Sequence, residues 1–404
     1  MDEIARVYLI LALSMGELEE GVVDAYYGPP ELRDEARRRN TGTATLAKEA
    51  RSLRERVNAE TEGDRRRWLD RQLVALETIA HALGGEQLPY VAEVQHCFDA
   101  NPEQTPDNVY ADLRTRLHDL LPAGEDLAAR LKARDELLTI PSDRVAGILE
   151  WVIQEVRQRS AIAFDTPPGE SLSVSLVSDE PWAAYNWYDG NLASRIEFNT
   201  DLPARAHHLV YTMTHETFPG HHLEHAWKEQ RLVRELGRWE CSVQLINTPE
   251  AYISEGLGEV GGRLVIDAET WQSLLMAIGE QAGIALTPSD AEREWQINQA
   301  LRAIRGSGGD AALQLHAEGR SRDEVRQFLI DDALRTPEQA DKNLDFITHP
   351  LWRTYVFCYA GGEQLLDRWL EPAGDLSARQ RRFFRLLTEQ LTPSGIAEEI
   401  AAAT

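Results

Sequence analysis

The residues best suited to chemistry in this sequence are gathered in one short segment, His215-Glu216-Thr217-Phe218-Pro219-Gly220-His221-His222. Zinc hydrolases need neutral imidazoles and carboxylates as metal ligands, together with an unligated carboxylate that accepts a proton from water. In the common His-Glu-x-x-His helix, two histidines four residues apart share one face and the glutamate is the base. Here position 219 is proline, and the next histidines are His221 and His222. The segment therefore has the right chemistry at an unusual spacing.

The spacing decides which histidine can share a metal ion with His215. On an unbroken helix, six residues rotate a side chain by about 600°, which turns His221 away from the His215 face. Seven residues return His222 to that face, but about 10 Å along the axis. Pro219 cannot continue the helical hydrogen bonds and Gly220 permits unusual backbone angles, so we expect a break there. Two looped-out residues would restore the four-residue phase, which predicts His221 as the second ligand and leaves His222 as the alternative.

A third ligand is expected from a neighbouring helix, and Glu255 is the strongest candidate. It lies in Ser254-Glu255-Gly256-Leu257-Gly258-Glu259, where small neighbours allow two helices to approach closely. Glu259 follows one turn later and faces the same way. Because a metal-bound histidine usually donates its other N–H to a carboxylate, Glu259 is predicted to accept that hydrogen bond. Two acidic residues aimed at a buried pair of histidines also need a cation to balance them.

The elements that position these residues are expected to be mostly helical. Apolar residues recur at helical spacing through much of residues 1–150. A helix resumes at Ala204 and carries the histidine segment, and another runs from Pro249 to about Ile266. Strands are predicted at three places before the histidine segment: Ser171–Val177, Trp182–Asn186 and Arg195–Phe198.

These elements predict a mainly α (α+β) fold with one small β-sheet beside the active-site helix. We expect an N-terminal helical region over residues 1–150 and a zinc-hydrolase catalytic region over residues 151–404. The length of 404 residues is enough for two or three lobes, and 43% hydrophobic with 27% charged residues is ordinary for a globular protein.

Charge and cysteine content narrow the classes of partner and compartment. The 42 basic and 67 acidic residues give a formal charge of -25, which argues against nucleic acid as a partner. No stretch is long enough to cross a membrane, and the Met-Asp-Glu start lacks the positive region of a signal peptide. Three distant cysteines, Cys97, Cys241 and Cys358, form no disulfide framework. These features predict a cytoplasmic protein.

The motif residues resemble a bacterial family known as domain of unknown function 885. Its hallmark, His-Glu-x-x-Pro-Gly-His-His, stands intact at residues 215–222. Glu255-Gly256-Leu257 is similar to the family's Glu-Gly-Trp segment, with Leu in place of Trp. Further similarity lies in Leu315-His316-x-x-Gly319 and in Tyr359-Ala360-Gly361-Gly362, so the resemblance covers roughly residues 150–390.

That family is grouped with the thermolysin-like zinc peptidases, the gluzincins. The resemblance implies a mostly helical fold in which a small sheet lays its edge strand over the zinc cleft, and Arg195–Phe198 is the expected edge. It also implies that Glu216 is the general base and that the zinc ligands are His215, His221 and Glu255.

One departure from the family concerns the group that stabilises the oxyanion. The family's Pro-Gly-Gln stretch before the tyrosine is replaced here by His349-Pro350-Leu351-Trp352-Arg353, and the spacing to Tyr359 differs. Tyr359 is the predicted stabiliser of the oxyanion. Three other candidates remain at this point: Tyr355, His349 and Arg353.

These residues predict a zinc-dependent hydrolase, in the first place a metallopeptidase acting on a peptide or small amide. Glu216 would take a proton from water as it attacks the peptide carbonyl and deliver it to the leaving amine. Two alternatives stay open: an amidase or ester hydrolase with a small non-peptide substrate, and a catalytically silent protein that binds metal or substrate. A purely structural zinc site is disfavoured, because such sites close with four protein ligands and favour cysteine.

Overall fold

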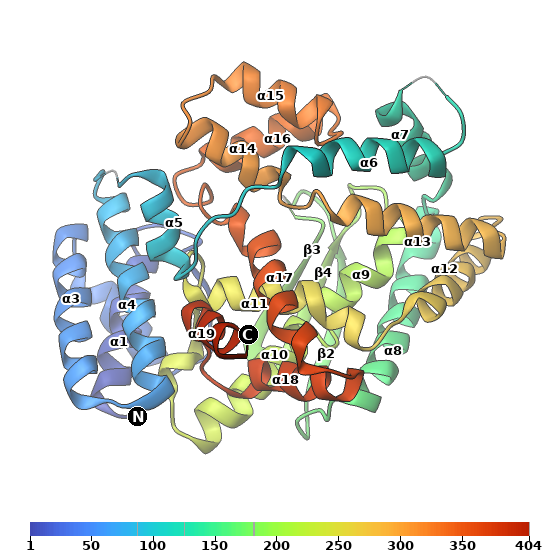
Figure 1. Ribbon diagram of the computed structural model, residues 1–404. Helices are drawn as coiled ribbons and strands as arrows, with labels where there is room; N and C mark the ends of the chain where they lie inside the picture. Colours follow the sequence, from blue (N-terminus) through green and yellow to red (C-terminus); the bar gives the residue numbers. More distant parts are fainter. Residues whose placement is uncertain (87, 125, 181, 404) are drawn as a thin grey trace.

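The computed structural model describes residues 1–86, 88–124, 126–180 and 182–403, and it is mainly helical with two small sheets (Figure 1). The predicted mainly α fold class is confirmed. The helices before the larger sheet are α1 (Glu3–Gly16), α2 (Pro30–Arg39), α3 (Thr43–Glu60), α4 (Gly63–Leu83), α5 (Tyr90–Phe98), α6 (Asp107–Leu120), α7 (Leu127–Leu137) and α8 (Val145–Ala163).

The helices after the larger sheet carry the histidine segment and the C-terminal half. They are α9 (Ala206–Glu216), α10 (His221–Lys228), α11 (Pro249–Gly261), α12 (Ala268–Ala282), α13 (Pro288–Arg302), α14 (Ser307–His316), α15 (Arg322–Asp331), α16 (Pro337–Thr348), α17 (Val356–Leu370), α18 (Leu376–Thr388) and α19 (Pro393–Ala403). Short helical turns lie at η1 (Ser142–Arg144), η2 (Glu229–Glu235), η3 (Trp239–Ser242), η4 (Gly262–Leu264) and η5 (Glu371–Ala373).

The strands form the predicted small sheet beside the helices of the histidine segment, and a second sheet that was not predicted. A three-stranded sheet contains β2 (Ser171–Val177), β3 (Ala184–Gly190) and β4 (Ala193–Asn199). A separate antiparallel pair joins β1 (Val23–Tyr26) to β5 (Val243–Leu245). Each strand of this second sheet has only three or four residues, which is too short for the alternation of polar and apolar side chains to be visible in the sequence.

The expected edge strand is wrong. The strand order is β2-β4-β3, so Arg195–Phe198 lies in the central strand, and β2 and β3 form the two edges. Asn191 and Leu192 adopt positive φ angles in the turn that pairs β3 with β4, and β2 then adds in parallel to the other side of β4. Hydrophobic periodicity shows where a strand runs and carries no information on the order in which strands pair.

Two groups of buried apolar side chains form the interior. The first joins α1, α3 and α4, which stand side by side (Figure 1), and also takes in Val243 of β5. The second is larger and contains buried residues of α8, α9, α11, α12 and α17, among them Leu209 on α9 and Leu257 on α11. The helices that carry the histidine segment and Glu255 are therefore fixed by the second core. None of the described helices is long and apolar enough to cross a lipid bilayer.

Helix α11 lies against α17 near the centre of the molecule (Figure 1). A Cβ at Gly256 would come within 2.6 Å of the carbonyl carbon of Gly362 on α17, so the absence of a side chain allows this approach. Packing on α17 fixes the position of α11, and with it the direction of the neighbouring Glu255.

Candidate metal centre

The histidine segment is a broken helix, as predicted from Pro219-Gly220. Helix α9 ends at Glu216 and α10 begins at His221. Between them the Phe218–Pro219 peptide bond is cis. The Gly220 N–H donates to the carbonyl of Thr214 at 3.0 Å, which folds the chain back onto the end of α9.

This fold-back brings the rings of His215 and His221 together. Their Nε2 atoms lie 3.1 Å apart, and the rings are nearly perpendicular at 89°. Oε2 of Glu255 lies 3.3 Å from Nε2 of His215 and 3.9 Å from Nε2 of His221. Helix α11 comes this close because Gly258 has no side chain, since a Cβ there would lie 2.6 Å from the His215 ring. Two imidazole nitrogens and one carboxylate oxygen, from three helices, thus converge in a buried place.

This set of atoms fits a divalent metal ion. Catalytic zinc sites use three nitrogen and oxygen ligands from the protein and keep a further position open. Glu255 Oε2 is buried and has no hydrogen bond of good geometry among the described residues. A buried carboxylate oxygen without a donor is unfavourable, and a cation at the meeting point of the three side chains would compensate it.

The carboxylate of Glu255 stabilises the charged forms of the His215 and His221 imidazoles, and they stabilise its charged form. Burial opposes the protonated form of His221, but Glu224 and Glu255 outweigh it and raise the pKa of that imidazole to about 9. Glu255 likewise raises the pKa of His215 against the effect of burial. Burial acts to raise the pKa of Glu255, and the two imidazoles reverse this to a net lowering. Carboxylates that hold protons on imidazoles can hold a cation in place of those protons.

His222, the alternative ligand, is directed towards the three-stranded sheet. Its Nδ1 lies 2.8 Å from Oγ of Ser194 on β4, and its Nε2 lies 2.9 Å from Oε2 of Glu170. The side chain is fully buried, and both ring nitrogens have partners. These contacts hold α10 against the three-stranded sheet.

Glu216, the predicted base, lies next to the converging atoms and is partly exposed. Its carboxylate makes no hydrogen bond or ion pair within the described part of the chain. Its backbone carbonyl accepts a hydrogen bond from Asn186 Nδ2 of the edge strand β3 at 2.7 Å. Burial raises the pKa of Glu216, and the nearby imidazoles of His215 and His221 offset only part of that effect. A carboxylate with a raised pKa is suited to accept a proton near neutral pH.

Glu259, predicted to accept a hydrogen bond from His215, lies near that ring but has other partners. Its Oε1 is 3.9 Å from His215 Nδ1, which is longer than a hydrogen bond. Glu259 instead accepts hydrogen bonds from the Tyr211 hydroxyl and the Arg305 guanidinium. The Arg305 guanidinium also lies over the Tyr211 ring, 4.5 Å from its centroid. Glu259 is thus part of a polar network beside His215.

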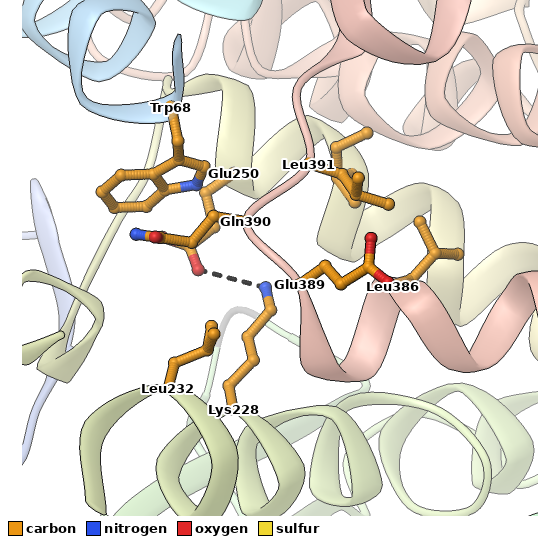
Figure 2. A pocket seen from close by; sticks show the side chains of 9 residues that line it. Trp68, Lys228, Leu232, Glu250, Leu386, Glu389, Gln390 and Leu391 are labelled. Carbon is orange, nitrogen blue, oxygen red and sulfur yellow. Dashed lines mark hydrogen bonds and ion pairs between the residues drawn. The ribbon is translucent and has the colours of Figure 1, made fainter. Parts of the chain in front are cut away.

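His221 has a carboxylate partner that the sequence analysis missed. Glu224 Oε2 lies 3.4 Å from His221 Nδ1 and accepts a hydrogen bond from Ser254 at 2.6 Å. Lys228 Nζ donates to the other oxygen of Glu224 at 2.7 Å. It also donates to Glu250 at 3.0 Å, in a small pocket lined by residues of α10, α11 and α18 (Figure 2). Despite burial, the Lys228 charge holds the pKa of Glu224 well below its usual range. The signal in the sequence was the spacing, because residues 221, 224 and 228 share one helical face.

Of the four candidates for the oxyanion group, two lie near Glu255. The Tyr355 hydroxyl donates to Glu255 Oε1 at 2.7 Å, so it fixes the orientation of that carboxylate. The Tyr359 ring is 5.8 Å from the Tyr355 ring and is 39% exposed. Its hydroxyl makes no hydrogen bond to any other described residue and remains free to donate.

The other two candidates are engaged in different contacts. Arg353 is held by the buried carboxylate of Glu93, with one nitrogen at 3.1 Å, and lies over the Tyr90 ring. His349 is exposed, and its Nδ1 accepts a hydrogen bond from the Leu351 N–H at 3.2 Å. Arg353 therefore joins two elements through an ion pair, and His349 stabilises a turn.

Two further residues beside this site were not singled out from the sequence. The Tyr185 hydroxyl on β3 donates to the Asp24 carboxylate on β1. Burial raises the pKa of Asp24, and the hydrogen bond from Tyr185 opposes that effect. Only the separate sheet of β1 and β5, which the sequence did not reveal, brings Asp24 to this place.

Comparisons with known proteins show the fold of this chain and leave its family open. No family model and no curated protein sequence matches it. A protein of Colwellia psychrerythraea described as a putative lipoprotein is similar in structure, with a TM-score of 0.53 and 14% identity over 88% of this chain. The chain spans 66% of that protein's length.

Two other solved structures are similar over more of the chain and at lower TM-scores. One is a putative lipoprotein of unknown function from Shewanella oneidensis, with a TM-score of 0.49, 13% identity, and coverage of 92% of this chain and 76% of that one. The other is an M32 carboxypeptidase from Deinococcus radiodurans R1, with a TM-score of 0.47, 14% identity, and coverage of 99% and 94%. At these identities the comparisons describe the fold, and the argument for function comes from the site.

Proposed function

We propose that this protein is a zinc-dependent hydrolase that cleaves peptide bonds. The observation that carries the proposal is the convergence of His215 Nε2, His221 Nε2 and Glu255 Oε2 beside a carboxylate with no partner, that of Glu216. The resemblance of residues 215–222 to the hallmark of domain of unknown function 885 supports the same conclusion. Glu259 is proposed as a further support of His215.

His215, His221 and Glu255 would hold the metal, and zinc best suits this mixture of nitrogen and oxygen ligands. When bound, it would supply a Lewis acid that polarises a carbonyl and lowers the pKa of water. Around it, the protein's own contacts set the ligand geometry. The Tyr355 hydroxyl orients Glu255, and Glu224 faces the outer nitrogen of His221. Second partners of this kind fix the orientation of metal ligands and raise their basicity.

Glu216 performs the proton transfers in this proposal. It accepts a proton from the attacking water and later donates it to the nitrogen of the leaving amine. The hydrogen bond from Asn186 to the Glu216 carbonyl ties this residue to the edge strand beside which the substrate would lie. Tyr359 has a free hydroxyl and is proposed to donate a hydrogen bond to the oxyanion.

The edge strand favours a peptide as substrate. One side of β3 pairs with β4, and the other side has no strand partner among the described residues. An extended peptide can add to such an edge through main-chain hydrogen bonds, which hold the scissile bond regardless of side-chain type. A small non-peptide amide has no means to use this edge.

The test measures bound zinc and turnover on the same preparations. We expect about one zinc per chain in the wild type and its loss in His215→Ala. The control is His208→Ala, which removes an exposed histidine of the same helix and should leave zinc and turnover unchanged. Glu216→Gln should keep zinc and lose turnover of a mixed peptide library by about 100-fold or more.

Two results would overturn the proposal. Absence of zinc binding after reconstitution of the wild type would refute the proposed metal centre. Full turnover in Glu216→Gln would refute the assignment of Glu216 as the base. Zinc binding with cleavage of acyl amides, and none of peptides, would instead replace the peptidase with an amidase.

A further inference from the structure

The carboxylate of Asp24 has no role in the hydrolysis proposed above, although it lies on a strand close to the site. The ladder between β1 and β5 shifts register between Val23 and Ala25, so Asp24 is the extra residue of a β-bulge. Bulges interrupt the normal alternation of side chains and redirect the residue at the bulge, often beside an active site. Asp24 is partly exposed, so a ligand can reach it.

The contacts of β1 and β5 connect the segment of Asp24 to the candidate metal centre. Ala25 pairs with Gln244, and the Gln244 amide donates to His225 Nδ1 at 2.7 Å. The His225 ring stacks parallel to the ring of His221 at 5.8 Å. From the other side, Asp24 accepts a hydrogen bond from Tyr185, which precedes Asn186 on the edge strand. Asp24 is thus bonded to the edge strand, and its neighbour Ala25 is linked through Gln244 and His225 to His221.

Asp24, which is partly exposed, differs from most buried carboxylates of this protein in the partners of its charge. Most buried carboxylates contact an arginine or lysine: Glu93, Glu224, Glu229, Glu240, Glu259, Glu294 and Glu363. The buried Asp310 has no such partner and is satisfied by Tyr110 and a backbone N–H. Asp24 has the Tyr185 hydroxyl and no ion-pair partner within the described part of the chain.

The charged groups near Asp24 leave its charge unbalanced when a metal is bound. Tyr185 donates a hydrogen bond to it, and the charges of Glu255, His221 and Glu216 are close enough to act on its pKa. A histidine that ligates a metal is neutral. One divalent cation would offset the charges of Glu216 and Glu255, and the charge of Asp24 would remain. A substrate that brings a positive charge would complete the balance.

We propose that Asp24 binds a primary ammonium group of the substrate, with the Tyr185 hydroxyl oxygen as a second hydrogen-bond acceptor. Aromatic rings continue this surface along β3, where Tyr185 lies 4.6 Å from Trp187 and 5.1 Å from Trp182 between ring centroids. Aromatic side chains beside a carboxylate favour an ammonium group over a neutral one. The inference rests on the proposed hydrolase function and specifies its substrate class.

An ammonium group of a peptide has two sources, the α-amino terminus and a lysine side chain. The probes are therefore four peptides: Ala-Leu-Ala, its N-acetyl form, an N-acetyl peptide with a lysine, and the same peptide with norleucine. We expect the zinc-loaded wild type to prefer an ammonium-bearing peptide to its uncharged partner by about tenfold or more in kcat/KM, the usual size of a charge-assisted hydrogen bond. The pair that shows the preference identifies the source.

Two variants separate charge from structure. Asp24→Asn keeps an acceptor for the Tyr185 hydroxyl and removes the charge, so it should abolish the preference and leave cleavage of the acetylated peptide nearly unchanged. Tyr185→Phe keeps the charge of Asp24 and removes the second acceptor, so the preference should fall and still exceed that of Asp24→Asn. An Asp24→Asn variant that loses activity equally on both members of a pair would overturn the proposal. So would a wild type that treats charged and uncharged peptides alike, a result that requires no variant.

A binding measurement keeps this test separate from the test of hydrolysis. Dissociation constants of the same four peptides are measured by calorimetry on zinc-loaded Glu216→Gln protein, with and without Asp24→Asn. If the wild type cleaves no peptide, tighter binding of a charged peptide that depends on Asp24 would support the ammonium site while the proposed hydrolysis fails. Equal binding of charged and uncharged peptides would overturn the ammonium site.

Discussion

Replacing Gly258 with alanine should weaken zinc binding through a shift of His215. The added Cβ would lie 2.6 Å from both Cε1 and Nδ1 of the ring, whereas ordinary contacts begin near 3.4 Å. Because α17 holds α11 from the other side, the ring must move by about 0.8 Å to relieve the clash. Metal–ligand distances tolerate deviations of only about 0.2 Å. We therefore expect zinc affinity to fall at least tenfold, or about 1.4 kcal/mol.

The same substitution should have a smaller effect on unfolding. Overpacking costs about 1–3 kcal/mol, and alanine gains about 1 kcal/mol over glycine in helix propensity, so a net loss of about 0–2 kcal/mol is expected. Zinc affinity is measured by competition with a chelator and stability by urea denaturation. Gly261→Ala on the same helix is the control, because its Cβ would meet the side chains of Phe383 and Pro219 at 3.1 Å and no proposed ligand. Wild-type zinc affinity in Gly258→Ala, or an equal loss in the control, would refute the reasoning.

Three further predictions concern residues around the centre. Lys228→Met leaves the buried Glu224 and the partly buried Glu250 without their cation and should destabilise the protein by about 3–5 kcal/mol in urea denaturation. Lys342→Met in an exposed pair should change stability by less than about 0.5 kcal/mol. Tyr355→Phe should lower zinc affinity about fivefold, because it removes one hydrogen bond to the ligand carboxylate of Glu255. Tyr359→Phe should lower kcat at unchanged zinc content. The reverse pattern would make Tyr359 the residue that orients the ligand and Tyr355 the one that stabilises the oxyanion. His222→Ala should lower the melting temperature and retain stoichiometric zinc, and loss of zinc at full stability would return this histidine to the ligand set.

Much of the site could be predicted because its signals are local in the sequence. Pro219-Gly220 marks a helix break through the lost N–H and the permissive glycine backbone, and the break is observed. Counting residues across it favoured His221 over His222, and the structure brings the ring of His221 beside that of His215. Glycines beside Glu255 indicated that its helix approaches others closely, and these contacts are observed.

The remainder depends on contacts between distant segments. Glu259 was expected beside His215 and lies there, but its partners Tyr211 and Arg305 come from helices whose relative rotation no local pattern determines. The edge position of β3 depends on the pairing of β2 with β4 across a hairpin. Asp24 owes its place to a four-residue strand and a single bulge, and neither leaves a periodic trace in the sequence.

The packing of α17 on α11 has a consequence for the protein during its synthesis. The histidine segment leaves the ribosome at residue 222, yet the tyrosine that orients Glu255 lies at 355, and the helix that clamps α11 ends at Leu370. At about 5–20 residues per second, roughly 150 further residues take on the order of ten to thirty seconds to add. Through that interval the side chains of the proposed metal centre lack the packing that would align them. If they bind a metal as proposed, the aligned site forms only after α17 has been made.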